Sequence, residues 1–506
     1  MNRIIVVLLF ASLASAQEPA ASDALSIRLV RPREQGERLL SLFQGARAPH
    51  PAAALAAWKH ATRGEASLGK PREALIACLN PQMVKEFGSL DDASLKLDFG
   101  SANDPIRWRL CLPSDDGTFA ALAPALSLTE GAAEKPLGDV PVLRLGPPGS
   151  SLSLRGSDRL VFASSRDQLE RVSIEPLAAP AALSLASGFH ARLDPQGLSA
   201  LTSLGARRLS TALEALACRQ VEGHAGVEGD AFTIELRSQL VLPFPSKARI
   251  DPSWLQAIPA SSVLAAACVA LDTDAKSLDA LFSILDRVEK ADPIRAGLAP
   301  LRVRLNLIAT AARVRLEVDL WPVLRGLTIA WLVDGQGAIL ALHASTEEAA
   351  GRIAREIVPR LAKPLLPHEK AANPRAERLS ESLGALEGKP LQISRRGGTL
   401  LIAWGERALP LAIKAWDHPE DSAARAIQAG WQGTLPSRTG ALWPGKMRTL
   451  APAGSALAKA LDESPPLVWR GISGPAQSRD TVRWTGLKAF VKGWLDALPL
   501  ERPPDR

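Results

Sequence analysis

One stretch, residues 319–360, constrains the fold more than any other part of the chain. Two apolar runs, residues 327–333 and 338–344, flank the segment Asp-Gly-Gln-Gly, in which the Asp-Gly pair supplies the positive φ that a tight hairpin turn needs. The next residues, Ser-Thr-Glu-Glu at 345–348, offer a helix cap followed by acidic side chains that suit the first helical turn. The stretch therefore predicts a β-hairpin followed by a helix that folds back on it.

Parts of this plan recur along the chain. Strand-like runs that enter a helix occur at residues 160–165, 339–345 and 400–405, and strand–turn–helix patterns occur at 110–122, 183–201 and 263–281. The spacing between these segments is too irregular for a solenoid. We therefore expect an α+β fold of repeated strand–helix–hairpin modules with mostly antiparallel sheets.

Three other segments need a choice between patterns. Residues 298–312 alternate like a strand over part of their length, but their apolar side chains fit a helix face over a longer distance, so we predict a helix. Residues 384–388 and 416–433 are predicted to be connections, and the end of the chain is predicted to form two strands and a helix, at 467–472, 481–484 and 487–498.

The chain of 506 residues is long enough for two to four domains. Residues 1–16 have the pattern of a secretory signal, because Arg3 precedes an apolar run and Ala14-Ser15-Ala16 has the small residues of a cleavage site. A Pro-containing stretch at 176–181 indicates a boundary. We expect an N-terminal α+β domain over 17–180, a central α+β domain of degenerate repeats over 181–425, and a C-terminal α+β segment over 426–506 that packs on the central domain.

The signal predicts an exported protein, periplasmic or extracellular. The apolar run near the N-terminus is too short to span a bilayer, and no later run is long enough, so no integral membrane span is expected after cleavage. The net charge of +7 is spread thinly over the chain. Without a dense Lys/Arg cluster interleaved with aromatic residues, nucleic acid is not an expected partner.

Export also permits disulfides among the four cysteines. Cys111 and Cys268 lie in strand-like runs, whereas Cys78 and Cys218 lie in helix-like runs. Four cysteines allow three pairings, between which the sequence does not choose, and buried free thiols are the favoured alternative. No Cys-x-x-Cys pair is present, so no zinc site is predicted.

Two short motifs approach those of enzymes and then depart from them. Residues 64–71, Gly-Glu-Ala-Ser-Leu-Gly-Lys-Pro, nearly form a phosphate-binding loop, but Pro71 replaces the Ser or Thr that would hold Mg²⁺. Ser67 and Lys70 match the Ser-x-x-Lys of penicillin-binding enzymes, but Gly69 and Pro71 oppose the helix on which that chemistry depends. We expect no nucleotide cofactor and no acyl-enzyme at this place.

The remaining polar residues show no catalytic constellation in the sequence. Seven His are scattered without a His-Glu-x-x-His pattern, and His190 and His343 each lie in a strand-like run, where a structural role is favoured. The paired acids at 91–92 and 115–116 suit turns and helix starts. We therefore predict no catalytic residue, no metal ligand and no cofactor.

Tryptophan is concentrated toward the C-terminus, with seven of the twelve Trp between Trp404 and Trp494. Exposed Trp faces can serve as stacking platforms for sugars, although a Trp more often buries its large surface in a core. Trp431, between two glycines, and Trp443, before a proline, are the best candidates for exposure. They are the candidate binding residues for a glycan or another partner.

Several phrases give the chain a family likeness. The phrase Asp-Leu-x-Pro-x-Leu-x-Gly at 319–326 precedes a hairpin, and Pro-Pro-Leu-Val-Trp at 465–469 and Val-Arg-Trp-x-x-Leu at 482–487 follow near the end. In these phrases and in its layout the chain resembles uncharacterised exported bacterial proteins of unknown function. That family has no assigned catalytic residues, so the resemblance implies none here.

Together these observations favour an exported, non-enzymatic cell-envelope protein that acts as an interaction scaffold for an unnamed protein or envelope partner. One alternative is glycan or cell-wall binding through the C-terminal Trp residues. Another is a hydrolase whose site is assembled from residues distant in sequence, since such convergence is invisible to motif analysis.

Overall fold

The structure is a computed structural model of the chain. It describes residues 25–42, 44–45, 92–98, 107–113, 130–137, 140–145, 151–155, 159–163, 166, 169–170, 188–193, 218–240, 248–273, 278–279, 282–283, 286, 301–333, 337–365, 380–386, 389–429, 431, 434–446, 464–473 and 477–496. The predicted signal sequence, the segment that nearly forms a phosphate-binding loop and the Ser-x-x-Lys motif lie outside these residues. Within them, no helix is both long enough and apolar enough to cross a bilayer.

The first half of the chain contributes ten strands and one described helix. These elements are β1 (Leu25–Val30), α2 (Pro32–Ser41), β2 (Asp92–Asp98), β3 (Arg107–Pro113), β4 (Glu130–Leu137), β5 (Val140–Leu145), β6 (Ser151–Arg155), β7 (Arg159–Ala163), β8 (Gly188–Leu193), β9 (Cys218–Glu228) and β10 (Ala231–Leu240).

The second half contributes nine strands, with helices between them. The strands are β11 (Val263–Ala270), β12 (Leu324–Leu332), β13 (Ala338–Ala344), β14 (Ser380–Leu386), β15 (Lys389–Arg396), β16 (Thr399–Trp404), β17 (Arg438–Leu442), β18 (Leu467–Ser473) and β19 (Gln477–Trp484). The α-helices are α11 (Leu301–Ala311), α12 (Glu347–Arg352), α13 (Val358–Leu365), α14 (Ala408–Asp417), α15 (Ala424–Gln428) and α17 (Leu487–Asp496). The 3₁₀-helices are η1 (Pro252–Leu255), η3 (Trp321–Val323), η6 (Pro419–Asp421) and η7 (Pro444–Lys446), and the π-helical segments are η2 (Leu316–Leu320) and η5 (Ile353–Ile357).

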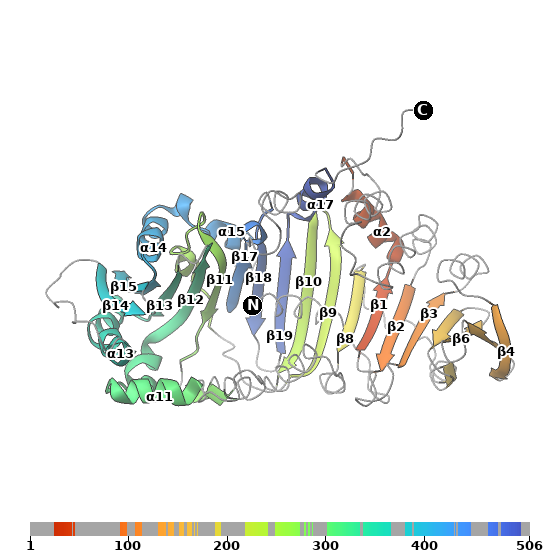
Figure 1. The fold of residues 1–506 in the computed structure, drawn as a ribbon, viewed down its shortest axis with the longest axis horizontal. Coiled ribbons are helices and arrows are strands. Elements are labelled where there is room, and N and C mark those ends of the chain that lie inside the picture. Colours follow the sequence, from red (N-terminus) through yellow and green to blue (C-terminus); the bar gives the residue numbers. More distant parts are fainter. Residues whose placement is uncertain are drawn as a thin grey trace.

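All of these strands join one antiparallel sheet that runs along the length of the molecule (Figure 1). The pairings give the order β4-β5-β6-β7-β3-β2-β1-β8-β9-β10-β19-β18-β17-β11-β12-β13-β16-β15-β14. The α+β class and the antiparallel sheet predicted from the sequence are therefore confirmed.

The sheet crosses the expected domain boundaries. It passes without a break from β1 to β8, across residue 180, and the last three strands of the chain lie between β10 and β11. The C-terminal segment thus supplies the strands that connect the two parts of the expected central domain. The division into domains stays a prediction.

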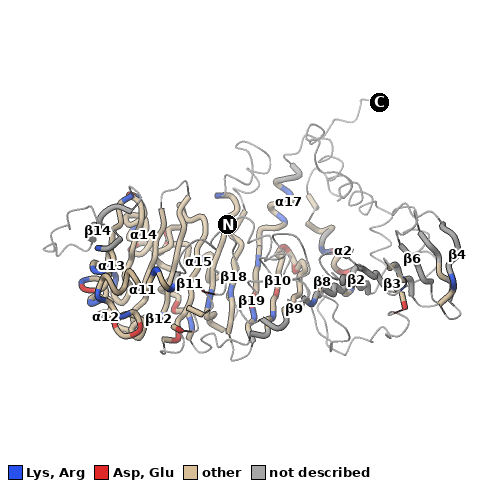
Figure 2. The backbone as a smooth tube through the Cα atoms, turned by 60° about the horizontal axis from the view of Figure 1, so that its bottom comes forward, with Lys and Arg blue, Asp and Glu red and all other residues tan. Residues whose placement is uncertain are grey.

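Successive side chains of a strand point to opposite faces of the sheet. In the second half of the sheet, the two faces belong to two different cores, so both are buried. On β13, Ile339 and Ala341 belong to a core that also includes residues of η1, α14 and α15. Leu342 and the neighbouring Leu400 of β16 face a second core with residues of η3, η5 and α13. Figure 2 shows acidic and basic residues gathered around α12 and α13, the helices beside this second core.

Local predictions for the hairpin and the helices agree with the structure. The hairpin is β12 and β13, and Thr346 caps α12 by accepting a hydrogen bond of 3.1 Å from the amide of Ala349. The ambiguous segment at 298–312 forms α11, as predicted. A tight turn joins β15 to β16, with Gly397 at a φ of 54°.

Three local predictions are wrong, and in each the tertiary context decided the outcome. Residues 384–386 complete β14, because β15 provides a ladder for them even across an irregular register at Gly384. Residues 416–433 include the end of α14, η6 and α15 in place of a plain connection. Cys218 opens strand β9, in place of the helix-like segment expected there, and its register partner is Leu240 of β10.

Candidate functional site

A row of polar side chains crosses the second half of the sheet on the face covered by η1. Cys268 of β11 pairs in register with Thr328 of β12, and His343 of β13 pairs with Thr399 of β16. Each of the four is at most 5% exposed. Residues opposite one another on adjacent strands share a face, so four strands place these groups in one line.

Hydrogen bonds join the row from end to end. The Thr328 hydroxyl lies 3.0 Å from Cys268 Sγ and 2.8 Å from His343 Nε2, and His343 Nδ1 lies 3.0 Å from Thr399 Oγ1. Thr328 Oγ1 also lies 3.2 Å from the main-chain oxygen of Trp254. Both imidazole nitrogens therefore have a partner, as a buried polar side chain requires.

One arrangement of protons satisfies every group in the row. The Thr328 hydroxyl has one proton, and the carbonyl of Trp254 can only accept, so Thr328 donates to that carbonyl. His343 Nε2–H then donates to Thr328 Oγ1, and Thr399 donates to His343 Nδ1. The Thr328 hydroxyl also points its proton toward Cys268 Sγ, so that proton is shared between the Trp254 carbonyl and the sulfur. This assignment makes His343 the neutral Nε2–H tautomer.

Trp254, in η1, covers the row of polar side chains. Its indole stacks on the His343 imidazole with ring centroids 4.7 Å apart and planes 5° apart. The space for the indole exists because position 326 is glycine: a Cβ at Gly326 would collide with the Trp254 ring. η1 is anchored in turn by Asp251, whose carboxylate accepts the Ser253 amide at 2.9 Å.

Burial keeps both ionisable members of the row neutral. Desolvation raises the pKa of the Cys268 thiol to about 12, partly offset by the hydrogen bond with Thr328. Desolvation also lowers the pKa of His343 to about 3, against a smaller opposing effect of the Asp251 carboxylate. A thiolate is the reactive form of cysteine, so Cys268 and His343 lack the electrostatics of an activated nucleophile and base.

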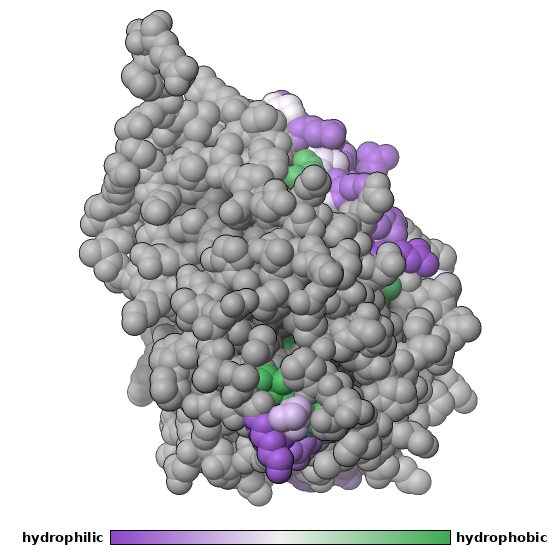
Figure 3. All heavy atoms as spheres, turned by 90° about the vertical axis from the view of Figure 1, so that its right-hand side faces the viewer, coloured by the Kyte–Doolittle hydropathy of each residue, from purple (hydrophilic) through white to green (hydrophobic). Residues whose placement is uncertain are grey.

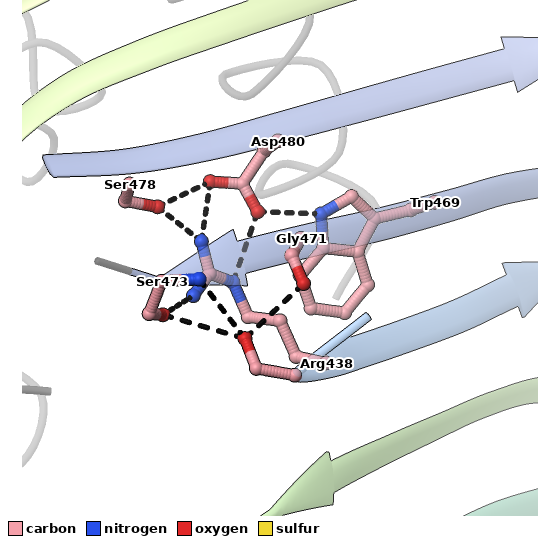
Figure 4. A network of polar contacts seen from close by, with 7 residues as sticks. Arg438, Trp469, Gly471, Ser473, Ser478 and Asp480 are labelled. Atoms are coloured by element: carbon pink, nitrogen blue, oxygen red, sulfur yellow. Dashed lines mark hydrogen bonds and ion pairs between the residues drawn. The ribbon is translucent and has the colours of Figure 1, made fainter. Parts of the chain in front are cut away.

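A second polar cluster lies near the middle of the sheet (Figure 4). Arg438 of β17 reaches across β18 to Asp480 of β19, with Nε 2.9 Å from Oδ1 and Nη2 2.6 Å from Oδ2. Trp469 Nε1 donates to Asp480 at 3.1 Å, and Ser478 donates to it at 2.9 Å. The side chains of Arg438 and Asp480 are 16% and 15% exposed. The carboxylate is therefore largely shielded from water, and the donors named above occupy its oxygens.

Gly471 permits this crossing. The register places Gly471 between Arg438 and Asp480, and a Cβ there would collide with Arg438 Nε and Asp480 Oδ1. Arg438 also donates to Ser473 and Ser478. This cluster fastens β17, β18 and β19 to one another, which is a structural role.

Trp431 and Trp443, the candidate binding residues, both pack against the core of the η1 face. The exposure expected for Trp443 is wrong, because it is 9% exposed. Trp431 is half-buried, and its Nε1 donates to Thr439 Oγ1 at 3.2 Å. Thr439 is the register partner of Cys268, so Thr439 lies one strand beyond the polar row, with Trp431 hydrogen-bonded to it. Glycan binding at these two residues stays a prediction.

The other candidate residues have simple surroundings where they are described. Cys268 is a buried free thiol. His190 of β8 stacks on His224 of β9, with ring centroids 4.6 Å apart. In the described ranges, no group of three or more His, Cys, Asp or Glu is arranged to hold a metal ion.

Sequence reasoning did not find the row, because its members are separated by up to 131 residues and follow no motif. The only local signal was that Thr328, His343 and Thr399 are polar residues inside otherwise apolar strand runs. A buried polar residue needs a partner, so such interruptions can mark a shared network.

Comparisons with known proteins add little to this picture. No protein-family model matches the chain, and no curated protein matches it. Among solved structures, crystal forms I and III of TP0453 are similar at 10% sequence identity and a TM-score of 0.25, over 47% of this chain and 82% and 83% of theirs. Crystal form IV has the same identity and TM-score over 44% of this chain and 78% of its own. A TM-score of 0.25 is too low to carry an argument about fold or function.

Proposed function

We propose that this chain is an exported, non-enzymatic scaffold of the cell envelope, built of repeated strand–helix–hairpin modules. The observation that supports it most is the state of the buried row. Its thiol and imidazole are neutral, hydrogen-bonded and covered by Trp254, which suits a role in holding strands together. An enzyme site would instead bring such groups to a surface that a substrate reaches.

The shape of the sheet supports the same proposal. One antiparallel sheet extends along the whole molecule and gives it an elongated form (Figure 1). At the β4 end, the described surface is mainly hydrophilic around small hydrophobic areas (Figure 3). Exposed aliphatic groups occur near the other end, where Val303 and Leu307 of α11 are 44% and 64% exposed.

Val303 and Leu307 are one helical turn apart, so they share one side of α11. Val318, in η2, is 54% exposed. Aliphatic side chains at this exposure are candidates for contact with an envelope partner.

The test combines fractionation with cross-linking in the native host. Export predicts a mature protein that lacks residues 1–16 and is recovered with the envelope. Cross-linking is then compared between wild type, Leu307→Lys and Leu435→Lys, the last being a matched exposed leucine at 42% exposure between α15 and β17. A partner bound at α11 is lost with Leu307→Lys and retained with Leu435→Lys.

Two results would count against the proposal. One is recovery of the unprocessed chain with Met1 in the cytoplasm. The other is a hydrolytic activity, measured on envelope substrates, that is abolished by Cys268→Ser or His343→Gln while the variants keep the wild-type circular dichroism spectrum.

A further inference from the structure

The two halves of the sheet have the same connectivity. The first half follows the order β5-β6-β7-β3-β2-β1-β8-β9-β10. The second half follows β14-β15-β16-β13-β12-β11-β17-β18-β19. Numbered from its own first strand, with β4 set aside, each half has its strands in one identical order. Such an order contains two non-sequential neighbours, so a chance match is improbable on topological grounds.

Buried side chains match between the halves as well. Val161 and Ala163 of β7 correspond to Leu401 and Ala403 of β16, and all four are fully buried. A helical residue follows each strand at the same distance: Leu169 after β7 and Leu409 after β16, at 1% and 2% exposure. Each pair is separated by the same 240 positions in the sequence. The equivalence thus extends from the strand order to individual core positions.

The two halves meet through equivalent strands. β10 and β19 are the last strands of their halves, and they pair antiparallel from Phe232 opposite Trp484 to Gln239 opposite Gln477. Antiparallel pairing of equivalent strands is the geometry of a twofold axis, as in a symmetric dimer. In the described part of the chain, the halves meet mainly along these strands, with α17 adding contacts to β10.

We infer that the chain is an internal dimer of two equivalent units, and that the β10–β19 seam is an interaction surface that a second copy of this chain fits by exchanging units. In the exchanged dimer, the first unit of one copy pairs with the second unit of the other. Every unit keeps its own core and an identical seam. Residues 241–247 are the part of the sequence between β10 and the second unit.

Several features of the chain favour exchange. The sequence between the units, 241–247, is seven residues long and includes prolines at 243 and 245, and a short connection between units promotes domain swapping. Ile250, three residues after this stretch, already belongs to the core of the second unit. The seam carries charged pairs that select its partner: Arg479 Nη2 lies 2.9 Å from Glu235 Oε2, and Lys488 Nζ lies 3.5 Å from Asp230 Oδ1.

A charge exchange across the seam tests this inference in the full chain. One copy carries Glu235→Arg and a first affinity tag, and the other carries Arg479→Glu and a second tag. Each variant alone places like charges at its own seam. In the exchanged heterodimer one seam pairs the two altered residues and the other seam is wild type, so both are complementary.

The matched control uses an ion pair that stays within one unit. Asp279 Oδ1 and Arg302 Nη2 are 3.0 Å apart, and exchange of units does not change which copy supplies them. Chains carrying Asp279→Arg and Arg302→Asp therefore gain nothing from forming a heterodimer. Both pairs of variants are unfolded in urea, mixed and refolded, and species carrying both tags are quantified by tandem affinity capture and light scattering.

We expect the seam pair to yield roughly three- to tenfold more heterodimer than the control pair, as two cross-strand charge pairs imply. The heterodimer should have twice the chain mass of 53.8 kDa. Equal yields from the two pairs, or no heterodimer from either when each refolded variant has the wild-type circular dichroism spectrum, would overturn the inference. Mixing after separate refolding should give no heterodimer, because exchange requires the seam to open.

Discussion

The ion pair between Arg438 and Asp480 offers the sharpest test of what holds the middle of the sheet together. In Asp480→Asn the carboxylate becomes an amide of the same shape, and the guanidinium of Arg438 keeps its buried position without a counter-charge. Asp480 accepts hydrogen bonds from Arg438, Trp469 and Ser478. An amide oxygen replaces only part of these acceptors, and its NH₂ group faces donors.

The magnitude follows from burial. Both side chains of the pair are about one-sixth exposed. Removing one partner of a buried pair costs about 3–5 kcal/mol, because the remaining charge is left uncompensated. A matched surface pair, Lys414 with Asp421, is 63% and 42% exposed, so that Asp421→Asn should cost about 0–1 kcal/mol.

The assay is urea unfolding followed by circular dichroism, with hydrogen exchange of the β17–β19 amides to locate the loss. We expect a lower midpoint and faster exchange in these strands for Asp480→Asn, and little change for Asp421→Asn. A double variant, Arg438→Met with Asp480→Leu, should recover most of the loss, because it removes both charges. Equal costs for Asp480→Asn and Asp421→Asn would refute the reasoning.

Three further predictions concern the polar row beneath Trp254. The pKa of His343 is about 3 in the folded protein and 6.5 in an unfolded chain, so the unfolded state binds more protons below about pH 6.5 and stability falls from there toward about pH 3. Urea midpoints measured from about pH 7.5 to about pH 4 should fall less steeply for His343→Gln than for wild type, and identical slopes would contradict the assignment. The pKa of Cys268 is about 12 when folded, against 9.0, so its stabilising contribution is present below about pH 9 and is lost as the pH rises toward 12. Its thiol should resist a disulfide reagent until the protein is unfolded in urea, and rapid labelling of the native protein at Cys268, located by peptide mass, would show that the row is open. Finally, Gly326→Ala should cost about 1–3 kcal/mol by pushing the Trp254 ring off His343, whereas Gly397→Ala, where a Cβ meets no atom within 4 Å, should cost only the strain of its positive φ. Equal melting temperatures for Gly326→Ala and wild type would contradict this packing.

The elements predicted best from the sequence are those whose causes are local. The β12–β13 hairpin, the cap at Thr346 and the helix α11 were all predicted from periodicity, capping and turn residues within a few positions. The terminal strands β18 and β19 and the helix α17 were predicted in the same way. Each depends on contacts between residues that are near in sequence, and these are the contacts that local patterns encode.

The candidate site was not predictable in this way. Cys268, Thr328, His343 and Thr399 form one row only because β11, β12, β13 and β16 are neighbours in particular registers. A shift by one residue in any strand would turn its member to the other face. The placement of Trp443 in the core was likewise decided by packing, which the proline after it did not reveal.

The sequence by itself determined the α+β class, the apolar strands and the positions of several helices, because alternation, capping and turn chemistry act over short distances. Only the tertiary structure decided that β19 pairs with β10, that the last strands lie in the middle of the sheet, and that four distant polar groups share one buried line. These outcomes depend on which strand edges meet, and an edge of main-chain donors and acceptors has nearly the same chemistry in every strand.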